Sequence, residues 1–175
     1  MNEFGILTDV NLGMDFFQEY FDKLEWKGLN FNETKAGPYS VSKGVIDEVP
    51  DIQYWAKSIP TEMHDYKLRK FLVSTFRKYG INTRKFQVDF FMIPKGGCIP
   101  PHIDIDSEIN LLIPLSKNCG VLGIKTPNAE MRLVYHTMFI LNTKNLHWVE
   151  EVTDDRLTLR VTIPDFKYQD LNIWK

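Results

Sequence analysis

The stretch IPPHIDIDSEINLLIPLS, residues 99–116, sets two polar side chains at the start of an apolar segment. His102 and Asp104 stand two residues apart, and residues two apart on a β-strand point to the same face. The residues that follow, INLLIPL, read as a buried strand. A buried carboxylate is costly unless it is paired or bound to a cation. The pattern therefore predicts that His102 and Asp104 share one strand face, where a cation would compensate the carboxylate.

Short apolar segments separated by turn signals continue on both sides of this stretch, over residues 84–165. Turns at intervals of about ten residues are typical of a sandwich, barrel or jelly roll. The expected strands are FQVDFFMI (86–93), HIDI (102–105), INLLIPL (109–115), GVLGIK (120–125), MRLVYHTMFIL (131–141), HWVEEV (147–152) and RLTLRVTI (156–163).

Helical periodicity precedes this region. A first helix over residues 12–27 has Gly28 as a plausible stop, and a second over residues 61–79 ends at Gly80. Residues 29–60 read as irregular. The two apolar stripes are expected to pack against the outside of the β core; they comprise Phe16, Phe17, Tyr20, Phe21 and Leu24, then Leu68, Phe71, Leu72, Phe76 and Tyr79.

The whole chain fits one domain, residues 1–175. We divide it into a helical and irregular part (1–83), a jelly-roll core (84–165) and a C-terminal tail (166–175). Of its 175 residues, 43% are hydrophobic, and the net charge of −2 gives no reason to expect nucleic acid or a membrane surface as a partner. No signal peptide or membrane span is evident, and Cys98 and Cys119 are too few for a disulfide scaffold. We expect a cytoplasmic protein with reduced thiols.

A metal site needs a third ligand, and two histidines follow in the strand region. His136 lies inside RLVYHTMFIL, where a core or edge role suffices, although a ligand role stays open. His147 follows a polar turn. Its separation from Asp104 along the sequence is typical of a strand that returns to the same site in a small barrel. Two His and one carboxylate form the facial set that leaves open positions on non-haem Fe(II). Zinc could bind the same set, but open positions favour iron-dependent oxygen chemistry.

Arg156 and Thr158 follow His147 and share one face of their strand, opposite Leu157 and Leu159. An arginine fork and a hydroxyl can clamp a carboxylate. The turn TDD (153–155) is expected to make the His147 and Arg156 segments antiparallel neighbours. Arg160 and, more weakly, Arg132 are substitute candidates, and a surface salt bridge from Arg156 to Asp154 or Asp155 is the alternative.

The set of His102, Asp104, His147, Arg156 and Thr158 resembles the Fe(II)- and 2-oxoglutarate-dependent dioxygenases over about residues 84–165. The resemblance implies a double-stranded β-helix, also called a jelly roll and cupin-like. It also implies that the two His and the Asp bind iron and that Arg156 binds the distal carboxylate of 2-oxoglutarate. Thr158 stands where many members have serine, which keeps the hydroxyl.

Within that family, the INLLIPL strand and the ending HWVEEVTDDRLTLRVTIPD look most similar to the aspartyl/asparaginyl β-hydroxylases and the small prolyl hydroxylases. The resemblance implies hydroxylation of an amino acid or of a peptide or protein side chain, with O2 consumed and succinate and CO2 released. Asn110 could hydrogen-bond the metal-proximal carboxylate of 2-oxoglutarate, and Tyr135 or Trp148 could line the pocket. The alternatives are a non-catalytic or zinc-bound cupin-like binding protein and a metal-dependent isomerase or lyase, which needs no Arg156 clamp.

Overall fold

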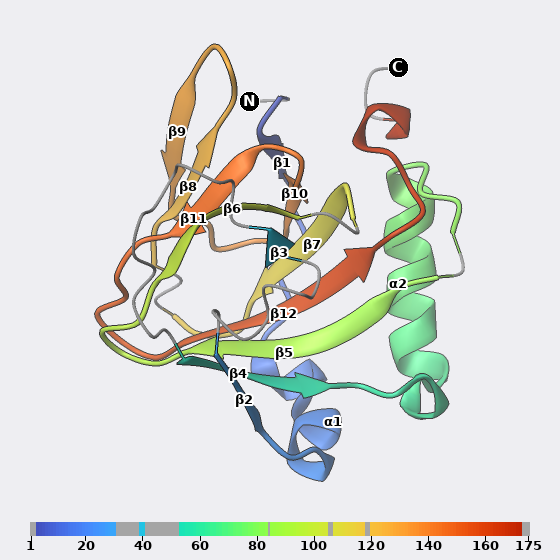
Figure 1. The fold of residues 1–175 in the computed structure, drawn as a ribbon. Helices are drawn as coiled ribbons and strands as arrows, with labels where there is room; N and C mark the ends of the chain where they lie inside the picture. The colour runs from blue at the N-terminus through green and yellow to red at the C-terminus, as the bar shows by residue number, and fades with distance from the viewer. Residues whose placement is uncertain are drawn as a thin grey trace.

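The computed structural model describes residues 3–30, 39–40, 53–83, 85–104, 107–117 and 120–172. Over these ranges the chain forms two antiparallel β-sheets folded over each other, with two α-helices packed outside (Figure 1). This arrangement confirms the mainly β jelly-roll fold with the helices outside it.

The larger sheet has seven strands among the described residues, and all their pairings are antiparallel. Two long central strands, β7 and β12, run side by side with Leu111 opposite Val161. In spatial order the strands are β1 (Gly5–Leu7), β10 (Phe139–Asn142), β7 (Ile109–Pro114), β12 (Arg156–Ile163), β5 (Gln87–Ile93), β4 (Gln53–Ser58) and β2 (Lys27–Asn30).

The smaller sheet has five strands among the described residues and closes over the inner face of the larger one. Its strand β11 lies between β6 and β8. In spatial order its strands are β3 (Tyr39–Ser40), β6 (Ile99–Asp104), β11 (Leu146–Val149), β8 (Leu122–Lys125) and β9 (Glu130–Leu133).

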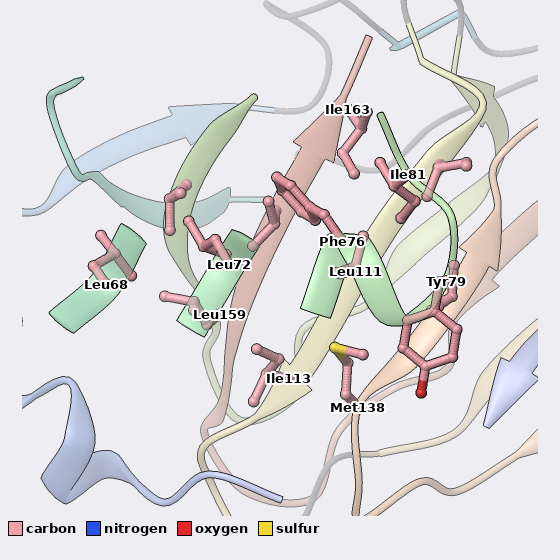
Figure 2. Close-up of a cluster of buried hydrophobic side chains, with 14 of the residues drawn as sticks. Leu68, Leu72, Phe76, Tyr79, Ile81, Leu111, Ile113, Met138, Leu159 and Ile163 are labelled. Carbon is pink, nitrogen blue, oxygen red and sulfur yellow. The ribbon is translucent and has the colours of Figure 1, made fainter. Parts of the chain in front are cut away.

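Strand β12 separates two apolar clusters because successive side chains point to opposite faces. Leu159, Val161 and Ile163 face outward into a cluster with helix α2 (Tyr66–Lys78), and Figure 2 shows Leu159 and Ile163 in this cluster. Arg156 and Thr158 face inward, toward the smaller sheet. The interior between the sheets has its own apolar cluster, which includes Ile93, Leu112 and Leu122. The predicted division of β12 into two faces is confirmed.

The helices are shorter than predicted. A 3-10 turn, η1 (Met14–Phe16), leads into α1 (Gln18–Lys23), and η3 (Thr61–Met63) precedes α2 (Tyr66–Lys78). Gly28 does not stop the first helix, because it lies inside strand β2. Both predicted apolar stripes belong to the outer cluster or pack against it, so the packing role is confirmed. A last 3-10 turn, η4 (Tyr168–Asp170), follows β12.

Two predictions about where strands lie are wrong. Residues 29–60 are not irregular throughout, since β4 extends the larger sheet beside β5. The segment 131–141 is not one strand, because it divides into β9 and β10, which belong to different sheets. The expected reduced state of Cys119 falls outside the described residues. Within the described ranges, none of the helices combines the length and apolar character needed to cross a bilayer.

Candidate metal centre and its cavity

Strands β6 and β11 bring His102, Asp104 and His147 together. His147 lies directly opposite His102 in the antiparallel pairing, and Asp104 follows two residues later on the same strand face. One ligand atom from each side chain lies within 4.8 Å of the other two. All three side chains are buried, with Asp104 only 3% exposed. The described residues therefore converge where the sequence predicted.

Hydrogen bonds to the backbone fix the tautomer of each imidazole. Nδ1 of His102 lies 2.8 Å from the carbonyl oxygen of Pro100, and Nδ1 of His147 lies 2.9 Å from that of Asn145. A carbonyl oxygen only accepts, so each Nδ1 must carry the hydrogen. Each Nε2 is then an acceptor with a lone pair, at 3.6 Å (His102) and 3.8 Å (His147) from Oδ1 of Asp104.

Asp104 presents one oxygen to this cluster and uses the other structurally. Its Oδ2 accepts a hydrogen bond of 2.9 Å from the Asn110 amide, whereas its buried Oδ1 has no donor among the described residues. Burial raises the pKa of Asp104 to about 6 and lowers the pKa of His102 to about 3 and of His147 to about 4. Two neutral imidazoles and one carboxylate thus aim acceptors at one point, which fits a divalent cation such as iron or zinc.

The turn between β10 and β11, which the sequence predicts only as a polar turn before His147, holds both sides of this cluster. The backbone N–H of Asp104 donates to the carbonyl of Thr143 at 3.1 Å, and Nζ of Lys144 donates to the carbonyl of Asp104 at 3.1 Å. The Thr143 hydroxyl, fully buried, donates to the carbonyl of Ser107 at 2.6 Å. Asn145 in the same turn orients His147, so residues 142–145 position two of the three candidate ligands.

A cavity opens from this cluster toward β12 and is lined by Arg156, Thr158 and Arg160 together with apolar side chains. Arg156 is 3% exposed, and its Nη2 donates to the Tyr135 hydroxyl at 2.6 Å. Oγ1 of Thr158 is buried and has no hydrogen-bond partner among the described residues. Such a cavity, apolar with a few convergent polar groups, is typical of a ligand site.

The connection between His147 and Arg156 differs from the prediction. Strand β11 pairs with β6 and β8, whereas β12 pairs with β5 and β7, so the two segments are not neighbours in one sheet. The chain crosses from one sheet to the other after β11. His147 and Arg156 consequently line the cavity from opposite sheets. Arg156 is buried, so its reading as a surface salt bridge is also wrong.

Several secondary candidates lie elsewhere. His136 is exposed, and Arg132 pairs with Glu130 and Glu150 on the surface of the smaller sheet. Trp148 does not line the cavity, because its ring lies against Gly123 and occupies the space that a Cβ there would fill. The Tyr135 hydroxyl accepts the hydrogen bond from Arg156.

Asn110 lines the cavity, and its amide nitrogen is committed to Asp104. Its Oδ1 is buried and has no donor among the described residues. The amide therefore supports a candidate ligand directly. Its predicted contact with 2-oxoglutarate stays a prediction.

Comparisons with known proteins place the chain by shape rather than by sequence. No protein-family model matches it, and no curated protein matches it in sequence. An oxidoreductase of the 2OG-Fe(II) oxygenase family from Burkholderia pseudomallei is similar in structure, at 14% identity over 85% of this chain and 77% of that one, with a TM-score of 0.57. A Pseudomonas putida prolyl-4-hydroxylase is similar at 14% identity over 83% of this chain and 96% of that one, with a TM-score of 0.52. At such identity the likeness shows a shared fold: this chain is a jelly roll of the kind on which those two proteins are built.

Proposed function

We propose that the chain is an Fe(II)- and 2-oxoglutarate-dependent dioxygenase that hydroxylates an amino acid or a peptide or protein side chain. The observation that carries the proposal is that one cavity holds both a set of candidate metal ligands and a buried arginine with a neighbouring hydroxyl. Three buried acceptor atoms converge from His102, Asp104 and His147, and the cavity they face is also lined by Arg156 and Thr158. Both neighbours in shape carry oxygenase or hydroxylase names, which agrees with the proposal.

His102, Asp104 and His147 would hold the iron through Nε2, Oδ1 and Nε2. Three protein ligands leave coordination positions for other groups. When bound, the iron and 2-oxoglutarate supply an oxidative decarboxylation that releases succinate and CO2 and uses O2 to hydroxylate a C–H bond. The second oxygen of Asp104 stays with Asn110, which fixes the direction in which Oδ1 points.

Arg156 and Thr158 would bind the distal carboxylate of 2-oxoglutarate. The arginine is buried and held by Tyr135, so its fork is oriented before the ligand arrives. The buried Thr158 hydroxyl adds one donor beside it. The apolar walls, which include Leu112, Leu122 and Val149, exclude water and strengthen these contacts.

The alternative is a zinc-bound binding protein, since zinc accepts the same His and Asp donors. The test is succinate formation from 2-oxoglutarate with Fe(II), screened across free amino acids and peptides. The proposal expects succinate with the wild type, loss of it in His147→Gln, and no change in the surface variant His136→Gln. Tight zinc binding without any succinate, with or without added amino acids, would favour the binding protein.

A further inference from the structure

A row of three polar side chains crosses the inner face of the larger sheet at the edge of the cavity. Ser58 lies opposite Asp89 in the pairing of β4 with β5, and Asp89 lies opposite Arg160 in the pairing of β5 with β12. The Ser58 hydroxyl donates to Oδ1 of Asp89 at 2.6 Å, and Nη2 of Arg160 lies 3.2 Å from Oδ2. Both oxygens of the buried carboxylate are thus occupied, and the row holds the guanidinium at a fixed place.

Arg160 is the member of the row that lines the cavity; Asp89 and Ser58 border a separate hollow behind it. The guanidinium carbon lies 5.0 Å from the centre of the Phe91 ring, and the side chain is 18% exposed. A cation held by a carboxylate behind it and stacked on an aromatic face is pre-organised for a planar anion. Arginine has five N–H groups, more than the contact of Nη2 with Asp89 uses.

The position of Arg160 along β12 separates it from Arg156. Thr162 lies opposite Asn110, which holds Asp104, and Arg160 is one pleat from Thr162. Arg156 lies two pleats further, roughly 13 Å along the strand at about 3.3 Å per residue. Arg160 and Arg156 therefore lie too far apart along β12 for one carboxylate to bridge them, and both line the cavity. Two guanidinium groups, those of Arg156 and Arg160, thus reach the cavity wall, and Asp89 balances the charge of the second.

Resting on the proposed function, we infer that Arg160 binds a carboxylate of the substrate. The substrate is then an acid whose carboxylate lies a few bonds from the carbon that reacts. The α-carboxylate of a free amino acid and the side-chain carboxylate of an acidic residue share this chemistry. Arg160 sets specificity in this assignment, while Asp89 and Ser58 position it.

The test uses the full chain loaded with Mn(II), which reports nearby protons by paramagnetic relaxation, and saturated with 2-oxoglutarate. The probes are propionate and its neutral analogue propionamide. The wild type should enhance the relaxation of propionate and leave propionamide nearly unaffected. Arg160→Gln should weaken propionate binding roughly tenfold or more, as expected for the loss of a charge-assisted hydrogen bond. Arg160→Lys should retain part of it, and the surface control Arg132→Gln should match the wild type. The dissociation constant of 2-oxoglutarate should stay within about twofold in all variants.

A second arm separates the two carboxylate sources. Asparagine offers only an α-carboxylate. N-acetylaspartate whose α-carboxyl group is converted to an amide offers only a side-chain carboxylate. The stronger relaxation effect identifies the source, and its loss in Arg160→Gln supports the assignment.

Four results would overturn the inference. The first is an equal effect of propionate and propionamide on the wild type, a comparison that requires no variant to fold. The second is unchanged propionate binding in Arg160→Gln, and the third is that neither carboxylate of the second arm depends on Arg160. The fourth is a loss of 2-oxoglutarate affinity in Arg160→Gln, which would show that this arginine binds the co-substrate. A wild type that binds neither Mn(II) nor 2-oxoglutarate would instead remove the proposed function, and this inference with it.

Discussion

Asp104 is the residue on which the site depends most, because burial makes its charge costly. Its Oδ2 is stabilised by Asn110, but Oδ1 has no hydrogen-bond donor among the described residues and lies 3.6 and 3.8 Å from two neutral imidazole nitrogens. Acceptors facing acceptors repel, and a divalent cation between them turns the repulsion into three favourable contacts. This local conflict is the strongest physical reason to assign a metal to the site.

Arg156 and Thr158 give a prediction at the same scale. Arg156→Gln should weaken 2-oxoglutarate binding by about 2–5 kcal/mol, because the distal carboxylate would be left buried without its partner. Thr158→Val should weaken it by about 0.5–1.5 kcal/mol, the contribution of one neutral hydrogen bond. The measurement is calorimetric titration of the Mn(II)-loaded protein, with Arg132→Gln as the surface control. Unchanged affinity in Arg156→Gln, or equal losses of metal and 2-oxoglutarate binding, would contradict the assignment.

The turn at residues 142–145 is the element that holds the candidate ligands in place. Thr143→Val removes the hydroxyl bond to Ser107 while nearly keeping the side-chain volume, so Ser107, three residues after Asp104, loses one buried hydrogen bond. We expect Mn(II) affinity to fall by up to about tenfold, since one such bond contributes roughly 0.5–1.5 kcal/mol. Thr143→Ser should restore it. Manganese titration followed by electron paramagnetic resonance measures both variants; equal affinities in Val and Ser would show that the hydroxyl does not position Asp104.

Helix α2 begins at a cap with a pH dependence of its own. The Asp65 carboxylate accepts hydrogen bonds from the Leu68 backbone N–H at 2.9 Å and from the Tyr20 hydroxyl at 2.5 Å. These bonds hold the pKa of Asp65 below its usual value. The stabilisation is therefore complete above the pKa of the unfolded chain, about 3.9, and is lost as the pH falls through the lower folded pKa.

Asp65→Ala should accordingly lower the free energy of unfolding by about 1 kcal/mol at neutral pH. The difference in the free energy of unfolding between Asp65→Ala and the wild type should become smaller in strong acid. Urea unfolding at several pH values measures this, and Glu62→Ala, in the exposed turn before the helix, is the control. A difference that grew toward low pH would contradict the cap.

The whole molecule has two apolar clusters with different roles. The outer cluster joins the helices to the larger sheet, and the inner one lines the cavity. Leu72→Ala, at a fully buried position of the outer cluster, should lower the free energy of unfolding by about 2–5 kcal/mol. The Mn(II) affinity of the folded protein should not change. Val73→Ala, 42% exposed on the same helix, should stay within about 0.5 kcal/mol. A large loss of metal affinity in Leu72→Ala would show that the two clusters are coupled.

The sequence was most informative where local periodicity alone decides the structure. Alternation placed His102 with Asp104, and Arg156 with Thr158, on common faces, and the structure confirms both pairs. Which strands pair is a long-range property, so the turn at 153–155 was read as a hairpin although the chain there changes sheets. Strand β4 was missed because QYWAKS lacks strict alternation of apolar and polar residues. Thr143 was missed because its role comes from tertiary hydrogen bonds.

The most direct test of the metal site is Fe(II) binding under anaerobic conditions, with iron titrated into the wild type, Asp104→Ala and His136→Gln. The site predicts one iron per chain for the wild type and for His136→Gln, whose imidazole is exposed and away from the cluster. Asp104→Ala should lose this binding while remaining folded by circular dichroism, because the only carboxylate of the described cluster is gone. Normal iron binding by Asp104→Ala would show that His102, Asp104 and His147 do not form the iron site.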